Sequence, residues 1–425
     1  MREPRETRAA RTRAFVIHPD LDRRRDPTPR FGEAMALARA LPDLDVVGGE
    51  VVPLRDPRPG TLFGTGRLAE IGARLKAEDV ELVLVDGPVT PVQQRNLEKE
   101  WGVKLLDRTG LILEIFSDRA ATREGVLQVE MAALAYQRTR LVRAWTHLER
   151  QRGGLGFVGG PGETQIEADR RAIDEQITRL KRQLEKVVRT RQLHRDARAK
   201  VPYPVVALVG YTNAGKSTLF NRLTGADVLV KDMLFATLDP TMRAVRLDGA
   251  GDVILSDTVG FVSELPTQLV AAFRATLEEV LSADLILHVR DIAAAESVAQ
   301  AADVEEILAS LGTPKETPRI EVWNKIDLLS AEQREAMLAQ ASRRPDVVPI
   351  SAVGGEGIDE LMDRIGEALG GIRLEDTVIL GPERGRQRAW LHQSGLVEDE
   401  TVRDDGASEM RVRWTQSQRG AFERL

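Results

Sequence analysis

The chain has 425 residues, of which 42% are hydrophobic and 30% charged, as in ordinary globular proteins. This length predicts two to four domains, and the absence of cysteine excludes disulfides, thiolate metal sites and cysteine nucleophiles. The net charge of −6 conceals a basic block, because residues 121–200 hold 17 Lys and Arg against 10 Asp and Glu. Such a block indicates a polyanionic partner, although a solvated helical surface would have the same composition.

The apolar runs of the sequence are short. The run "VVALV" near the middle has far fewer than the about 20 residues that a membrane-spanning helix needs, so no membrane insertion is expected. The basic start "MREPRETRAARTR" has no apolar stretch behind it, so it does not resemble a signal peptide. The absence of cysteine fits a cytoplasmic protein, and we also expect a monomer.

Residues 13–120 alternate short apolar runs with helical stretches, which predicts a small α/β domain. Strands are expected in "AFVI", "VVGGEVV", "LVLVDG" and "VKLLD". Helices are expected around Glu33–Ala40, Gly66–Ala77 and Pro91–Glu100. The glycines of "GTLFGTGRLAEI" indicate a turn that leads into a helix rather than a ligand loop. This part of the sequence contains no recognisable chemical motif.

Two long segments with apolar residues at four- and three-residue spacing come next. This spacing predicts helices whose apolar faces pack against another helix. The segments flank residues 152–171, "RGGLGFVGGPGETQIEADRR", so we expect an antiparallel hairpin with this glycine-rich stretch at its apex. "PGETQ" opens the second helix, with Glu163 near its positive end. The expected seam residues are Leu127, Met131, Leu134, Leu141, Trp145, Leu148, Ile166, Ile173, Ile177, Leu180, Leu184 and Val187.

From residue 205 to about 371, strands and helices alternate again, which predicts a doubly wound α/β domain. The last 50 or so residues hold three short runs, "TVIL", "RAWLHQ" and "MRVRW", broken by an acidic turn, "EDETVRDDGAS". They indicate a small β or α+β domain. The expected boundaries are 1–120 for the N-terminal domain, 121–200 for the hairpin, 201–371 for the doubly wound domain and 372–425 for the C-terminal domain.

The sequence "GYTNAGKST", Gly210 to Thr218, follows the strand "VVALV" and precedes a helical stretch. It fits the phosphate-loop pattern of two glycines with four residues between them, followed by Lys-Ser. In this pattern backbone N–H groups surround the phosphates, Lys216 reaches the β/γ oxygens and Ser217 ligates Mg²⁺. The strand before the motif and the helix after it support this interpretation.

Three further motifs follow predicted strands. "DTVG", Asp257 to Gly260, would hold the Mg²⁺ water shell with its carboxylate and meet the γ-phosphate with its glycine amide. In "NKID", Asn324 to Asp327, the aspartate would accept hydrogen bonds from guanine N1–H and the 2-amino group, neither of which adenine offers. "SAV", Ser351 to Val353, would place a backbone amide on guanine O6. The four motifs in this order predict a P-loop GTPase domain.

The stretch "FATLDPT", residues 235–241, lies where a GTPase needs a mobile loop whose threonine completes the Mg²⁺ shell. Both Thr237 and Thr241 qualify by residue type. Phe261 follows "DTVG", where Ras-like enzymes carry a water-orienting glutamine, so slow intrinsic hydrolysis is expected. Asn213 lies inside the phosphate loop, as in GTPases that recruit K⁺, and K⁺ activation is a hypothesis.

These motifs and, above all, "GGPGETQIEADRR" resemble the HflX family of translation-factor-related GTPases over residues 13–371. The resemblance implies that the N-terminal domain and hairpin dock on the 50S ribosomal subunit. It also implies that the protein dissociates stalled or stressed 70S ribosomes, and that ribosomes stimulate its GTP hydrolysis. Thr237 becomes the Mg²⁺-ligating threonine in preference to Thr241. Gly159 stands where many members have an arginine, so the apex loses one phosphate-binding side chain.

The predicted site has several parts. The residues expected in catalysis are Lys216, Thr237 and Gly260, and those expected to ligate Mg²⁺ are Ser217 and Thr237. The residues expected to contact GTP are Gly210, Tyr211, Thr212, Asn213, Ala214, Gly215, Lys216, Ser217, Phe235, Ala236, Thr237, Leu238, Asp239, Asp257, Thr258, Val259, Gly260, Asn324, Lys325, Ile326, Asp327, Ser351, Ala352 and Val353. The residues expected to contact RNA are Arg150, Arg152, Gly154, Gly156, Phe157, Arg170 and Arg171.

Alternatives remain for the apex and for the function. The glycine-rich stretch could be a linker, but it joins helices that must pack closely and lies between arginines, which favours an RNA contact. Phe157 could stack on a base or anchor the loop locally. A GTPase for large-subunit assembly or RNA remodelling would use the same surface without separating subunits. A small-molecule kinase is opposed by "NKID" and by the lack of a recognisable acceptor site.

Overall fold

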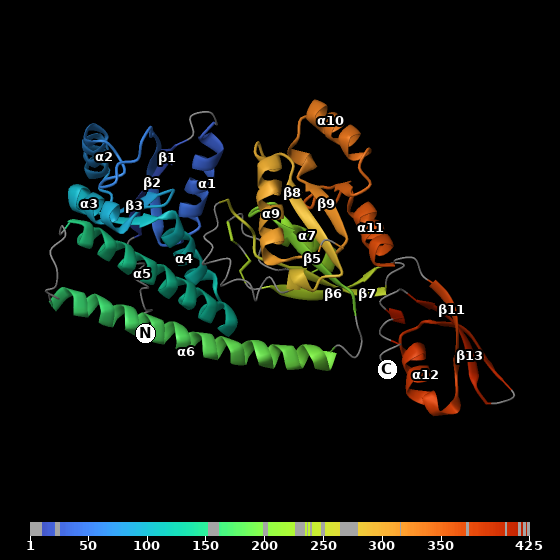
Figure 1. Ribbon diagram of the computed structural model, residues 1–425. Coiled ribbons are helices and arrows are strands. Elements are labelled where there is room, and N and C mark those ends of the chain that lie inside the picture. The colour runs from blue at the N-terminus through green and yellow to red at the C-terminus, as the bar shows by residue number, and fades with distance from the viewer. Residues whose placement is uncertain are drawn as a thin grey trace, which may run out of the picture.

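The computed structural model describes residues 11–21, 26–151, 161–198, 203–225, 234–235, 237–238, 240–247, 251–263, 279–314, 316–370, 374–403, 406–414, 418–419 and 422. For 141–151, 161–166, 190–198, 370 and 374 only the backbone is described. Figure 1 shows an N-terminal sheet with a pair of long helices beneath it, a larger central sheet and a small C-terminal sheet. No described helix is both long and apolar enough to cross a membrane.

The N-terminal domain has a parallel sheet with strand order β2-β1-β3-β4. Parallel neighbours need crossover connections, and helices provide them here. The strands are β1 (Thr12–Asp20), β2 (Leu44–Pro53), β3 (Leu82–Val85) and β4 (Lys104–Asp107). The helices are α1 (Thr28–Arg39), α2 (Thr65–Ala77), α3 (Pro91–Trp101) and α4 (Arg108–Arg119). The α/β prediction is confirmed, and α4 is an additional helix that the sequence pattern did not indicate.

The ends of α3 illustrate how local sequence sets an element. Thr90 and Gln93 form a reciprocal capping box, in which each side chain accepts a hydrogen bond from the other residue's backbone N–H. Pro91 occupies the first turn, where its missing N–H costs nothing. Gly102 ends the helix with a left-handed φ of 70°, a conformation that glycine adopts without strain.

The predicted hairpin is present as α5 (Arg123–Gln151) and α6 (Pro161–Arg198), which lie side by side in Figure 1. The described seam residues of α6, among them Ile173 and Ile177, are half-buried, while Ala172, Glu175 and Gln176 beside them are exposed. Arg138 of α5 donates to Asp174 of α6 at 2.8 Å, which links the helices across the seam. The side chains of the expected seam residues Leu141, Trp145, Leu148 and Ile166 lie outside the described part of the chain.

The base of the hairpin is tied to the N-terminal sheet by buried polar contacts. Tyr136 OH donates to Asp107 Oδ1 at 2.5 Å, and Arg140 Nη1 donates to Asp107 Oδ2 at 3.1 Å. Arg140 also donates to the side-chain oxygen of Gln94 and lies 5.0 Å from the centre of the Tyr136 ring. Because Asp107 also caps α4 through Gly110 N, one carboxylate fixes both helices against the sheet.

The central domain has a six-stranded sheet with order β10-β9-β8-β5-β7-β6. Only the edge strand β6 runs antiparallel, paired with β7, so the doubly wound sheet is mixed. The strands are β5 (Val205–Gly210), β6 (Thr241–Leu247), β7 (Gly251–Asp257), β8 (Leu285–Asp291), β9 (Arg319–Asn324) and β10 (Val347–Pro349). The helices are α7 (Lys216–Thr224), α9 (Ser297–Leu311), α10 (Ala331–Ala341) and α11 (Ile358–Gly370), with a 3-10 turn, η1 (Ile326–Leu328).

The C-terminal domain is an antiparallel sheet of order β11-β13-β12 with one helix packed against it. Its elements are β11 (Leu374–Leu380), the 3-10 turn η2 (Pro382–Arg384), α12 (Gly385–Gln393), β12 (Val397–Val402) and β13 (Ser408–Trp414). The expected acidic turn is therefore wrong over β12. There Glu398 lies 3.6 Å from Arg411 and 3.8 Å from Arg413 of β13, which offsets its low strand propensity.

Candidate functional site

The phosphate-loop motif lies at the carboxyl end of the inner strand β5, where ligands bind in open α/β sheets. Its glycines are required by close packing. A Cβ on Gly210 would lie 2.1 Å from the carbonyl oxygen of Val289, and a Cβ on Gly215 would lie 2.2 Å from Nδ2 of Asn324. Gly215 and Asn213 have φ values of 94° and 59°, so the loop turns through left-handed backbone before α7 begins.

Lys216 is the first residue of α7 and is buried beneath this loop. Its ammonium donates to the carbonyl oxygens of Gly210 at 3.1 Å and Tyr211 at 2.9 Å, so it spans the loop from below. Burial lowers the pKa of Lys216 to about 8, although the charge of Asp257 opposes the shift. A buried cation in a loop of backbone N–H groups suits an anionic ligand.

Three oxygen-bearing side chains converge next to Lys216. Asp257 Oδ2 accepts from Ser217 Oγ at 2.7 Å and from Thr237 Oγ1 at 2.9 Å, and the two hydroxyls lie 2.9 Å apart. Burial raises the pKa of Asp257, while Lys216 and the two hydroxyls act in the opposite direction. Asp257 Oδ1 is buried and has no hydrogen-bond partner within the described residues. This set of hard oxygen donors fits Mg²⁺.

Thr241 lies elsewhere. It is the first residue of β6 and faces Asp257 in the register of the antiparallel β6–β7 pair. The hydroxyl that meets the Asp257 carboxylate belongs to Thr237, the threonine favoured from the sequence.

The segment after β7 crosses the phosphate loop closely. A Cβ on Gly260 would lie 2.8 Å from Thr212 Cγ2 and 3.0 Å from Lys216 Nζ, so only glycine fits without displacing them. Phe261 N donates to Gly210 O at 3.1 Å, and Thr212 N donates to Phe261 O at 2.7 Å. The Phe261 side chain is buried, with 1% exposed. This position therefore offers no side-chain hydrogen-bonding group to a water molecule at the phosphates.

The "NKID" and "SAV" motifs meet the phosphate loop through one buried side chain. Asn324 Nδ2 donates to Ala214 O at 2.8 Å, and Asn324 Oδ1 accepts from Ala352 N at 2.9 Å. Asp327 lies on η1 with its side chain exposed, beside the left-handed Lys325 at φ 69°. The three motifs are thus joined at one corner of the sheet.

Two further contacts stabilise this corner. Lys325 Nζ lies 2.8 Å from Asp291 Oδ2 at the end of β8. Ser351 Oγ accepts from Gly354 N at 2.9 Å and so closes the turn that follows β10. Ile326 is buried, whereas Val353 is 73% exposed.

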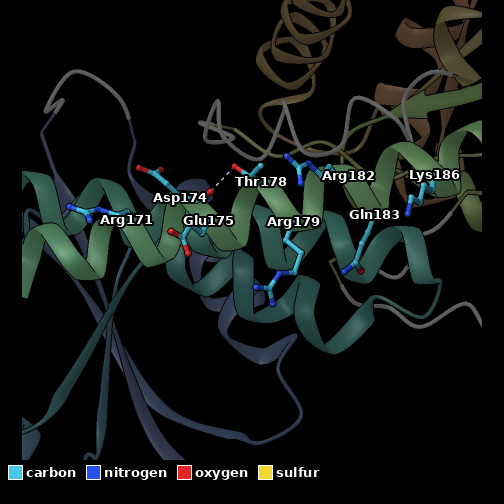
Figure 2. Close-up of a pocket in the computed structure, with 8 residues that line it drawn as sticks. All are labelled: Arg171, Asp174, Glu175, Thr178, Arg179, Arg182, Gln183 and Lys186. Carbon is cyan, nitrogen blue, oxygen red and sulfur yellow. Dashed lines mark hydrogen bonds between the residues drawn. The ribbon is translucent and has the colours of Figure 1, made fainter.

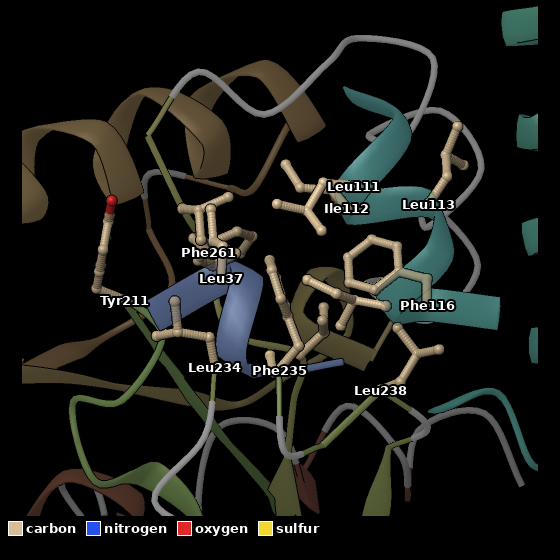
Figure 3. Close-up of a cluster of buried hydrophobic side chains, with 14 of the residues drawn as sticks. Leu37, Leu111, Ile112, Leu113, Phe116, Tyr211, Leu234, Phe235, Leu238 and Phe261 are labelled. Carbon is tan, nitrogen blue, oxygen red and sulfur yellow. The ribbon is translucent and has the colours of Figure 1, made fainter. Parts of the chain in front are cut away.

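Several predicted GTP contacts have side chains turned away from the phosphate loop. Figure 3 shows a buried apolar cluster that contains Tyr211, Phe235, Leu238 and Phe261 together with residues of α1 and α4. Of these four, Tyr211, Phe235 and Leu238 are predicted GTP contacts, and their buried side chains leave the backbone as the group that can approach a nucleotide. Ala236 and Asp239 lie outside the described residues. The remaining predicted positions, Thr258 and Val259, are also buried.

The cluster joins the N-terminal domain to the central one. The rings of Phe116 of α4 and Phe235 pack edge-to-face with centroids 4.6 Å apart. Leu37 of α1 and Ile112 of α4 are fully buried in the same cluster (Figure 3). The segments around Thr237 and directly after Asp257, which hold the oxygen donors described above, therefore share one hydrophobic core with the N-terminal domain.

A polar network lies beside this shared core. Arg108 Nη2 donates to the carbonyl oxygen of Ser263 at 3.0 Å and also pairs with Glu33. Glu33 accepts from the Tyr211 hydroxyl, which in turn accepts from Ser263 N at 2.7 Å. Arg108 Nη1 donates to Asp86 Oδ1 at 2.6 Å.

The sequence patterns did not single out Arg108, Glu33 or Ser263. The contacts of Glu33 with Arg108 and Tyr211, and of Arg108 with Ser263, span 75 to 178 positions, and no local spacing indicates such contacts. The one local signal is an arginine directly after a buried strand, which is unusual unless the charge is paired.

The predicted RNA contacts are only partly described. Arg170 and Arg171 are exposed on α6, and Arg170 Nε lies 3.9 Å from Asp174 Oδ2. Arg150 lies on α5, where only the backbone is described, and Arg152, Gly154, Gly156 and Phe157 lie outside the described residues.

Family models match almost the whole chain. They are described as GTP-binding GTPase N-terminal over residues 29–117, GTP-binding GTPase Middle Region over 119–198, 50S ribosome-binding GTPase over 205–325 and HflX C-terminal domain over 336–425.

Individual relatives agree with these models. GTPase HflX of Magnetococcus marinus is 48% identical over 395 residues, which cover 92% of this chain and 90% of the relative. GTPase HflX of Escherichia coli is 43% identical over 382 residues, which cover 90% and 88%. A crystal structure of a GTP-binding protein from Sulfolobus solfataricus in complex with GDP is 24% identical, with a TM-score of 0.45 over 84% of this chain and 98% of that one. The chain belongs to the HflX family and is a GTPase.

Proposed function

We propose that GTP binds over the phosphate loop of residues 210–217, with its base against Asn324, Asp327 and the 351–353 turn. Lys216 supplies the buried positive charge for the phosphates, and Ser217 and Thr237 supply oxygen ligands for Mg²⁺, with Asp257 behind them. Bound Mg²⁺ would neutralise charge on the β/γ-phosphates. Gly260 lies close enough to Lys216 for its backbone N–H to meet the γ-phosphate.

Two substitutions test this arrangement. Lys216→Ala removes the charge beneath the phosphates and should abolish tight GTP binding. Asp327→Asn exchanges the carboxylate for an amide and should shift preference from guanine to xanthine nucleotides. Titration of fluorescent GDP and XDP analogues measures both, and an Asp327→Asn variant with unchanged preference would refute the proposed base site.

We propose that hydrolysis is slow in the isolated protein and that ribosomes accelerate it. The buried phenyl side chain of Phe261 supports this, because it cannot orient the attacking water. Asn213, exposed and left-handed in the phosphate loop, is the residue that would favour a K⁺ ion beside the phosphates. Equal turnover in KCl and NaCl would remove the K⁺ hypothesis. If added ribosomal particles leave the rate of GTP turnover unchanged, the proposed stimulation is refuted.

We infer that the hairpin binds ribosomal RNA of the 50S subunit. A groove of about 700 Å³ lies along α6 and is lined by the side chains drawn in Figure 2: Arg171, Asp174, Glu175, Thr178, Arg179, Arg182, Gln183 and Lys186. The basic side chains outnumber the acidic ones, and Asp174 already pairs with Arg138. A row of exposed arginines on one helix face fits the phosphates of a folded RNA.

A charge-reversal pair tests this surface. Arg179→Glu with Arg182→Glu alters the groove, whereas Lys181→Glu with Arg189→Glu makes the same change in net charge at exposed α6 positions that do not line it. Binding to 50S particles should fall by about tenfold or more in the first variant and far less in the second, with GDP affinity unchanged in both. Equal losses in the two variants would point to net charge rather than to the groove.

We propose that GTP-dependent 50S binding dissociates stalled or stressed 70S ribosomes. The observation that carries this proposal is the shared core of Figure 3, because it connects Phe235 and Phe261 beside the nucleotide site with the domain that bears the hairpin. Rearrangement of these segments on GTP binding or hydrolysis would change that contact.

Sucrose-gradient profiles of 70S particles, with GTP or a non-hydrolysable analogue, test the dissociation. Growth of the 50S and 30S peaks is expected, and unchanged 70S peaks under both conditions would refute it. Binding to free 50S but not to 70S particles would favour the alternative, a GTPase for large-subunit assembly or RNA remodelling.

A further inference from the structure

The turn after β10 contains the backbone N–H groups that lie nearest the guanine base in the proposed site. Ser351 N donates to Glu356 O at 3.0 Å, Gly355 N donates to Ser351 O at 2.7 Å, and Gly354 N donates to Ser351 Oγ. Ala352 N is bound to the side chain of Asn324. Val353 N makes none of these bonds, and it can donate to the 6-oxo group of guanine.

Arg222, in the last turn of α7, contacts this turn from behind. Its Nε donates to the carbonyl oxygen of Ala352 at 2.5 Å, and its Nη2 donates to the carbonyl oxygen of Val353. The contacts span 130 and 131 positions of sequence and involve two consecutive peptide groups. A guanidinium is suited to this because its planar donors can hold two acceptors at once.

The direction of the Val353 N–H follows from this contact. The Ala352 carbonyl and the Val353 N–H belong to one planar trans peptide group and point in opposite directions. When Arg222 holds the carbonyl, the N–H points away from Arg222. Gly355 leaves room for the guanidinium, since a Cβ there would lie 2.9 Å from Arg222 Nη1.

We propose that Arg222 is a positioning residue for guanine selectivity, because it fixes the peptide whose N–H recognises the purine 6-oxo group. Arg222 itself does not touch the nucleotide. This inference rests on the proposed base site, and it adds a contact between the helix that begins at Lys216 and the turn that selects the base. Without Arg222 the peptide can rotate, and the 6-oxo group loses its oriented donor.

The test compares GDP with 6-thio-GDP, which keeps N1–H and the 2-amino group but replaces the 6-oxo oxygen by sulfur, a weaker acceptor. Wild-type protein should bind GDP more tightly than 6-thio-GDP. Arg222→Ala should weaken GDP binding roughly five- to tenfold but 6-thio-GDP binding much less, so that the preference shrinks. Arg222→Lys, with one compact ammonium, should give an intermediate preference.

Arg334→Ala is the matched control, because Arg334 pairs with the Glu356 side chain of the same turn rather than with its carbonyl groups. It should leave the preference unchanged. Equal loss of GDP and 6-thio-GDP binding in Arg222→Ala, or no loss, would overturn the inference. Asp327→Asn distinguishes failure of the proposed base site from failure of the role of Arg222. If Asp327→Asn changes the base preference but Arg222→Ala binds GDP and 6-thio-GDP as wild type does, the base site stands and only the role of Arg222 is refuted.

Discussion

At the scale of single residues, the nucleotide site depends on contacts that allow no extra carbon atom. Gly215 and Gly225 stand before and after α7, and both have left-handed φ values, 94° and 63°. A Cβ on Gly215 would meet Asn324, whereas nothing lies within 4 Å of a Cβ on Gly225. The two glycines therefore share a backbone requirement and differ in packing.

This difference gives the first prediction. Gly215→Ala should displace Asn324 from Ala214 and weaken GDP binding by about tenfold or more, while Gly225→Ala should pay only the backbone cost of about 1 kcal/mol in stability. Isothermal titration with GDP measures the loss of affinity in Gly215→Ala, and thermal melts measure the loss of stability in Gly225→Ala. Similar GDP affinities in both variants would show that the Asn324 contact does not shape the site.

Glu321 gives a prediction for the effect of pH on stability. Burial would raise the pKa of Glu321, but hydrogen bonds from Trp323, Arg344 and Arg290 lower it from 4.5 to about 2. The ionised carboxylate therefore contributes stability that is present above pH 4.5 and is lost as pH falls toward 2. The shift corresponds to about 3 kcal/mol, which solvent screening of this partly exposed carboxylate reduces to about 2 kcal/mol.

The matching measurement compares wild type with Glu321→Gln. The wild-type protein should melt at a higher temperature above pH 5, and the difference between the two melting temperatures should shrink as the pH is lowered toward 3. If the difference between the two melting temperatures stays constant over this pH range, the charge of Glu321 is not the cause of the higher stability of the wild type.

At the scale of elements, α4 packs against the loop that carries Thr237. Phe116 and Phe63 are both fully buried phenyl groups of the N-terminal domain, but only Phe116 contacts Phe235. Phe116→Ala should cost about 3 kcal/mol of stability and also speed the release of fluorescent GDP, because the loop loses its packing partner. Phe63→Ala should cost a similar amount without changing release. Stopped-flow displacement measures this, and equal release rates would contradict the proposed coupling.

Local sequence was sufficient for most elements of the central domain and not for the contact between domains. "VVALV" predicted a strand and the phosphate-loop motif predicted the start of α7, because strand pattern, glycines and helix onset are all local. The sequence also placed each motif after a predicted strand, but it did not indicate that Asn324 contacts Ala214 of the phosphate loop.

What the sequence left out has a physical reason in each case. The stretch "LILEIF" of α4 is buried nearly all round, so it lacks the polar face from which a helical period is recognised. Strand β12 is acidic, and its pairing depends on arginines of β13 that become neighbours only in the fold. The Glu33–Tyr211 contact joins residues 178 positions apart, which a single sequence cannot indicate.

At the scale of the whole molecule, the C-terminal domain has its own core. Leu380, Leu391, Met410, Val412 and Trp414 form a cluster whose described members all come from this domain. Removal of residues 374–425 should therefore leave GDP affinity within about twofold of the full chain. Calorimetry of the full chain should show an unfolding transition that the shortened chain lacks. A large loss of affinity would show that the domain supports the nucleotide site.

The covalent connection between α6 and β5 limits how far the helices of the hairpin can move away from the central sheet. Six residues separate Arg198 from Val205, and a fully stretched chain of that length spans about 25 Å. Strand β5 runs straight into Gly210. If the proposed ribosome contact pulls the hairpin away from the central domain by more than this length, the tension would act on β5 and so on the phosphate loop at its end.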